Sequence, residues 1–113
     1  MEKHELLSDE KFVERFVHGK VDNEIFSHEA QIRLTWLFLN KYGRAIATEK
    51  IIQTIEEINA SKNIEILIDK NLASQTIRIL DIYRKASNTS SFNSFKRKYP
   101  DIQKDTIKLF SIN

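Results

Sequence analysis

The polar residues best placed to do chemistry lie at helical spacing near the middle of the chain. His28, Gln31 and Thr35 recur every three or four residues within an otherwise apolar segment. On a helix, Gln31 and Thr35 fall within about 60° of His28, in the middle of the apolar face. Because buried polar groups need partners, this arrangement predicts either a small ligand pocket or a set of local hydrogen bonds.

His28 offers the most versatile chemistry of the set. It stands at the expected first turn of a helix, where unpaired N–H groups and the helix dipole disfavour the imidazolium ion. A neutral ring can bind a metal ion or accept a proton. In a functional interpretation, polar residues from a long second-half helix complete a pocket for a small molecule or a metal ion. The lining residues of this pocket would be His28, Gln31, Thr35, Asp69 and Asn71.

A structural interpretation of the same residues is the one we favour. His28 would bond to the backbone or to Gln31, and Thr35 would bond back to the preceding helical turn. Buried polar groups are usually satisfied locally in this way. The three side chains would then stabilise the fold and bind nothing.

Metal binding and catalysis have less support. A metal centre needs three or four ligands, and only His28 has a good donor at a constrained position. The carboxylates of Glu24, Glu29 and Asp69 would have to be recruited from elsewhere. No catalytic triad, carboxylate pair or glycine-rich phosphate loop stands out. We expect a protein without a metal or cofactor, and one that is not an enzyme.

The segment that carries His28 is predicted to be the central helix of the fold. Ser27 can cap its first turn, and Gly43 can adopt the left-handed conformation that ends it. A helix this apolar belongs in the middle of a bundle, with Trp36 buried at the centre. The side chains expected on the opposite, outer face are those of Glu29, Arg33, Leu37, Asn40 and Lys41.

Periodicity and caps predict further helices over residues 9–17, 44–59, 65–86 and 92–98, and a last one from about residue 102 to 110. The β-branched run at residues 64–68 is also compatible with a strand. We favour helix there, because no convincing partner strand is evident. A polar stretch, residues 87–91, reads as a loop. The chain is thus predicted to be all-α, a bundle of about five to six helices.

Composition is consistent with this fold. A chain of 113 residues is predicted to form a single domain, residues 1–113, of which we expect residues 1–8 to be flexible. Two glycines and one proline are too few for a sandwich or barrel that turns repeatedly. The lack of cysteine suits a reducing compartment, and the charged N-terminus predicts neither a signal peptide nor a membrane span. We expect a cytoplasmic location.

The positive charge is concentrated in the second half of the chain. Residues 1–57 carry 8 basic and 11 acidic side chains, whereas residues 58–113 carry 10 and 5. Lys96, Arg97 and Lys98 stand among aromatic residues, a combination that can bind nucleic acid. The aromatic residues recur at helical spacing, however, which is more typical of core anchors beneath a solvated basic face. We therefore expect nucleic acid not to be the partner.

The stretch from Ile25 to Gly43 resembles a family of small uncharacterised bacterial proteins. Its members share Phe, Ser or Thr, His, two residues, a second His, an aliphatic residue and Arg at a helix start, and Tyr-Gly at the helix end. The resemblance extends over roughly residues 25–110 and implies an all-helical fold without an established activity. Gln31 stands where the family has its second His. If the two histidines form a metal or proton-transfer site, this chain has kept His28 and lost its partner.

Three functions follow as hypotheses. The leading one is a non-enzymatic binding or protein-interaction module, with a protein partner or a second copy of the chain as its ligand. The alternative is a small-molecule or metal-binding protein with its site around His28. The third is a weak nucleic-acid binder.

Overall fold

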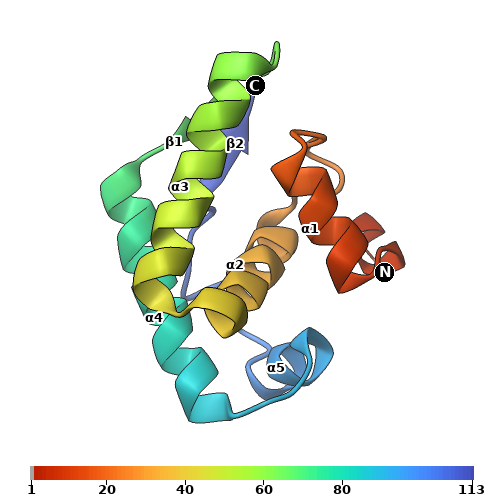
Figure 1. Cartoon of the computed structure of the whole chain (residues 1–113). Helices are drawn as coiled ribbons and strands as arrows, with labels where there is room; N and C mark the ends of the chain where they lie inside the picture. The colour runs from red at the N-terminus through yellow and green to blue at the C-terminus, as the bar shows by residue number, and fades with distance from the viewer. Residues whose placement is uncertain (1) are drawn as a thin grey trace.

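The computed structural model describes residues 2–113 and confirms the all-α prediction, with a two-stranded sheet as its only β-structure among these residues (Figure 1). The elements in chain order are the 3-10 helix η1 (Lys3–Leu6), α1 (Asp9–Val17), α2 (His28–Tyr42), α3 (Arg44–Ser61), β1 (Ile66–Ile68), α4 (Lys70–Ser87), α5 (Phe92–Lys98) and β2 (Phe110–Ile112). No helix in the described part of the chain is long and apolar enough to cross a membrane.

Helix α2 lies at the centre and packs against α1, α3, α4 and α5. The hydroxyl of Ser27 accepts a hydrogen bond from the amide of Ala30 at 3.1 Å, and Gly43 has a φ of 77° where the helix ends, as the caps predict. Trp36 is 5% exposed, which confirms its predicted burial. All residues from 30 to 36 are buried, so two turns of this helix are enclosed on every side.

The N-terminal segment is more ordered than we expected. Residues 2–8 form the 3-10 helix η1 and its flanks, and the His4 side chain is only 1% exposed. Met1, the first residue of the segment expected to be flexible, lies outside the described residues. Helix α1 then begins at Asp9 with Ser8 as its cap and buries Phe12 and Phe16. Residues 3–6 thus have defined contacts with the rest of the fold, and the flexibility of residues 1–8 stays a prediction.

The small sheet is the main departure from the predicted architecture. Residues 66–68 form strand β1, and the helix predicted over residues 65–86 begins only at Lys70. The partner strand is β2, which begins at Phe110, where the last predicted helix was expected to end, and the two strands are antiparallel with Ile66 opposite Ile112. Residues 101–105 form turns in place of that helix. The β-branched run was thus a strand signal, and helix was favoured there because the partner strand lies more than forty residues away.

Two side-chain amides close the outer edges of this sheet. Asn59 of α3 accepts from the Ile66 amide at 2.7 Å and donates to the Ile66 carbonyl at 2.9 Å. Gln31 of α2 accepts from the Phe110 amide at 3.1 Å and donates to the Phe110 carbonyl at 3.0 Å. Each amide thus takes the place of a neighbouring strand. Unpaired backbone groups would otherwise be buried there at substantial cost.

Replacing Gln31 with leucine should destabilise the protein strongly although the volume of the side chain is almost conserved. The substitution leaves the buried amide and carbonyl of Phe110 without partners, which should lower the free energy of unfolding by about 2–4 kcal/mol. Urea denaturation measures this loss, with Gln53→Leu on the exposed face of α3 as the control. A loss below about 0.5 kcal/mol would show that Gln31 does not hold β2 in place.

Candidate functional site

The structure gives His28 a specific partner in the C-terminal segment. Its Nε2 lies 3.1 Å from the hydroxyl oxygen of Thr106. Because that hydroxyl donates its own proton to the Ile102 carbonyl at 2.8 Å, His28 must be the donor and carries its proton on Nε2. Burial lowers the pKa of His28 below its ordinary value, nearby Lys108 lowers it further, and Glu2 opposes the shift. The ring is therefore held neutral as a hydrogen-bond donor.

The other predicted site residues also have local partners. Thr35 donates to the Gln31 carbonyl at 2.9 Å, the bond to the preceding turn that the structural interpretation predicts. Gln31 bonds to Phe110 and also donates to the Phe26 carbonyl at 3.2 Å. These contacts occupy both atoms of the Gln31 amide.

Among the described residues, no side-chain hydrogen bond joins the start of α4 to His28, Gln31 or Thr35. The Asp69 carboxylate caps α4 by accepting from the amides of Asn71 and Leu72. Asn71 itself is exposed. The five predicted residues therefore fall into separate local arrangements.

Arg33 is the functional group that the sequence analysis placed wrongly. Predicted to lie on the outer face of α2, it is 7% exposed and lies beneath the N-terminal segment. Its guanidinium donates to the carbonyls of His4 at 2.7 Å and Leu7 at 2.9 Å, and to the Asp9 carboxylate at 2.8 Å. It also lies 4.7 Å from the centre of the Phe12 ring. The segment expected to be flexible is thus held by a buried cation.

Glu2, His4 and Glu29 form the group among residues 2–113 whose ligand atoms, all within 4.8 Å of one another, best resemble a metal site. Arg33 donates to Nδ1 of His4 at 3.2 Å, so Nε2 carries the proton that bonds to Glu29 at 2.8 Å. Neither nitrogen then has a free lone pair for a metal ion. These three residues therefore form an ionic network that stabilises the N-terminal segment.

Lys96 completes that network from α5. Its ammonium lies 2.8 Å from a carboxylate oxygen of Glu5 and 3.4 Å from one of Glu29. The hydrogen bond from Lys96 lowers the pKa of Glu5, and the same bond raises the pKa of Lys96. One of the three consecutive basic residues of α5 is therefore engaged within the protein.

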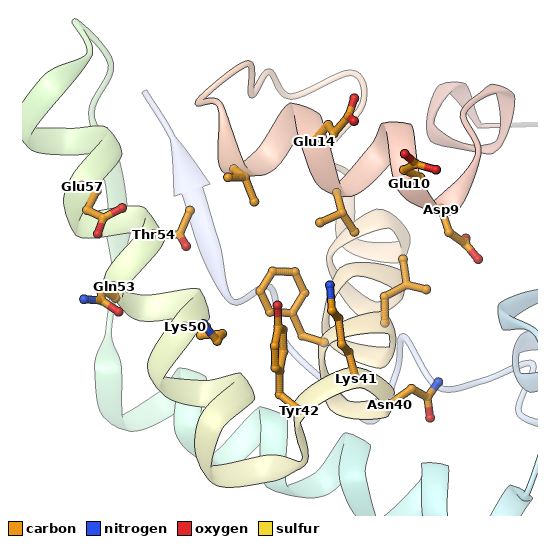
Figure 2. A pocket seen from close by; sticks show the side chains of 14 residues that line it. Asp9, Glu10, Glu14, Asn40, Lys41, Tyr42, Lys50, Gln53, Thr54 and Glu57 are labelled. Carbon is orange, nitrogen blue, oxygen red and sulfur yellow. The ribbon is translucent and has the colours of Figure 1, made fainter.

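A groove lies between α1 and α3 over the C-terminal half of α2 (Figure 2). We call it the α1–α3 groove. Its volume is about 800 Å³. The apolar part of its lining consists of Val13, Val17, Leu37, Phe38 and Tyr42. No sequence pattern predicted this groove, although Leu37 is an apolar residue on the face of α2 expected to be exposed.

Charged side chains of both signs flank the groove. Asp9, Glu10 and Glu14 lie along α1 and Glu57 lies on α3, whereas Lys41 and Lys50 lie where α2 leads into α3, with Tyr42 between them. The two ammonium groups lie 5.4 Å and 4.9 Å from the centre of the Tyr42 ring, respectively. Figure 2 shows the Tyr42 and Lys41 side chains extending from the end of α2 into the groove. The arrangement can bind an apolar group and orient a charged one.

Comparison with known proteins gives no relatives: no protein-family model, curated protein or solved structure matches the chain.

The stability of the protein should depend on the charge state of His28. Because its pKa is lowered in the folded state from about 6.5, the unfolded chain binds the proton more readily. Its contribution is present above about pH 6.5 and is lost as the pH falls through the folded-state pKa. Urea denaturation between pH 7.5 and 5 should show a smaller loss of stability in His28→Gln than in the unmodified protein. Equal pH dependence in the two proteins would contradict this assignment.

Removing the Arg33 guanidinium should be far more costly than removing its carboxylate partner. Arg33→Met leaves the carbonyls of His4 and Leu7 without donors and should lower the free energy of unfolding by roughly 2–4 kcal/mol. Asp9→Asn should cost below about 1 kcal/mol, because the Asp9 side chain is 61% exposed. Thermal and urea denaturation of both variants test this order, and comparable losses would refute it.

Proposed function

We propose that this chain is a non-enzymatic binding module and that the α1–α3 groove is its binding site. The observation that supports this proposal is the groove itself, an open volume of about 800 Å³ with an apolar floor between walls that carry charged side chains. Ligand sites are typically clefts of about 300–1,000 Å³.

The size of the groove favours a small ligand over a protein partner. Fourteen residues line the groove, whereas a stable protein interface uses about 20–30 residues on each side. A protein partner or a second copy of the chain would have to extend far beyond the groove. We therefore place the small ligand first and self-association second.

The other hypotheses receive less support. His28, Gln31 and Thr35 each have partners within the fold, which favours their structural role. Lys96 is paired with Glu5 and Glu29, which leaves fewer free cations for nucleic-acid phosphates. The lack of cysteine is compatible with the cytoplasmic location that we propose.

We also propose that the chain belongs to the bacterial family that it resembles, and that the shared motif has a structural role. Ser27 caps α2, Arg33 binds the N-terminal segment and Gly43 ends the helix with a positive φ. These functions of the motif require no ligand. They are compatible with a family whose members differ at the second histidine position, where this chain has Gln31.

Binding of a neutral solvatochromic dye such as Nile red tests the groove. Val17→Lys should weaken dye binding about tenfold, because it puts a charge on the apolar floor and removes the contact area of a valine side chain. Val17 is 51% exposed, so the fold should tolerate the change. Ile82→Lys, at a residue that is 57% exposed on α4 and outside the groove, is the control. Equal weakening by both variants, or no dye binding at all, would overturn the proposal.

A further inference from the structure

Lys41, Tyr42 and Lys50 form a cationic group at one end of the α1–α3 groove. Both ammonium groups lie beside the same aromatic ring, at 5.4 Å and 4.9 Å from its centre. Neither forms an ion pair with a carboxylate within residues 2–113, and the Tyr42 hydroxyl has no hydrogen bond within that range. Two cations and a hydroxyl donor are thus available to a ligand at the edge of an apolar floor.

The opposite wall of the groove is acidic, but part of its charge is already matched. Asp9 is bonded to Arg33 at 2.8 Å, and Glu14 lies 4.0 Å from Lys11. Glu10 and Glu57 remain exposed on α1 and α3, away from the two lysines' shared ring. An anionic group would therefore be placed at the lysine end of the groove and repelled from the α1 wall.

The apolar floor runs on from this cationic end. Leu37 and Phe38 lie about one turn before Tyr42 on α2, and Val13 and Val17 of α1 also line the groove. A ligand with a single charged head and a flexible apolar chain would match this layout, with its chain along the floor. The groove volume of about 800 Å³ is ample for one such molecule.

We propose that the α1–α3 groove binds a single-chain amphiphile with a carboxylate head, which the ammonium groups of Lys41 and Lys50 and the hydroxyl of Tyr42 hold. This inference rests on the proposed function and adds the chemical class of the ligand. Burial of the chain would provide most of the affinity, whereas the exposed cations would select the sign of the head.

Isothermal titration with three matched amphiphiles tests the proposal, each used below its micellar concentration. Decanoate should bind about tenfold more tightly than decanol at low salt, and decyltrimethylammonium should bind more weakly than either. The difference between decanoate and decanol should shrink at high salt, because exposed ion pairs are screened. Octanoate should bind about fourfold more weakly for each methylene removed.

Two double variants show whether the named lysines are responsible. In Lys41→Gln/Lys50→Gln, decanoate should lose its advantage over decanol, while the affinity for decanol should stay within about twofold. Lys20→Gln/Lys108→Gln removes the same net charge from exposed positions outside the groove and should retain the advantage. All four lysines are exposed, so thermal unfolding of the variants should match that of the parent protein.

The outcomes separate this inference from the proposed function. Equal binding of decanoate and decanol, or tighter binding of the cationic amphiphile, would overturn the carboxylate assignment and leave the groove as a binding site. Loss of the decanoate advantage in the Lys20/Lys108 variant would also overturn it. If none of the amphiphiles binds and Nile red does not bind either, both proposals fail. Chemical shift changes in NMR spectra confined to the lining of the groove would support both.

Discussion

Residues 30–36 of α2 have no face toward solvent, and much of the remaining structure follows from this constraint. Three of these residues are polar and need hydrogen-bond partners, which Thr35 finds in the preceding turn of α2 and the other two find in the segments that enclose the helix. Gln31 forms hydrogen bonds with the backbone of Phe110, and Arg33 donates hydrogen bonds to the carbonyls of His4 and Leu7. The two ends of the chain are therefore tied to the same two turns of helix, and the small sheet exists where one of them is held.

The same constraint indicates why a binding site would lie elsewhere on α2. In its enclosed part, Gln31, Arg33 and Thr35 are bonded within the fold, and the buried indole nitrogen of Trp36 has no partner among the described residues. A ligand there would have to compete with backbone hydrogen bonds. Beyond Trp36 the helix is enclosed on one side only: Phe38 and Leu39 are still buried, but the α1–α3 groove opens over this half of the helix. Leu37 and Tyr42 are only partly buried there, and Lys41 is exposed. Apolar surface and uncommitted charge therefore occur together only at this end of α2.

The parts of the fold that depend on local signals could be predicted from the sequence. Residues 9–17 and 92–98 are helical as expected, since Ser8 and Ser91 each cap a helix whose apolar residues recur at helical spacing. The sheet could not be predicted in this way, because a three-residue strand is specified by its partner and not by its own pattern. Arg33 was misplaced for a related reason. Its burial depends on a segment that composition alone suggested to be flexible.

The polar group on α2 could be predicted from the sequence, whereas its role and the position of the candidate site follow only from the tertiary structure. His28, Gln31 and Thr35 were correctly placed on one helix face, yet polar residues on an apolar face indicate only that partners must exist. Those partners can be a ligand or the protein backbone, depending on which segments pack over that face. The segments that do so come from distant parts of the chain. Conversely, Lys41 and Lys50 were unremarkable as charges on helix surfaces. Only the tertiary structure, in which α2 leads into α3 at Gly43, shows them as a pair beside one aromatic ring at the edge of an apolar groove. A charged side chain on a helix surface therefore indicates a binding site only when the structure shows that it has no ion-pair partner.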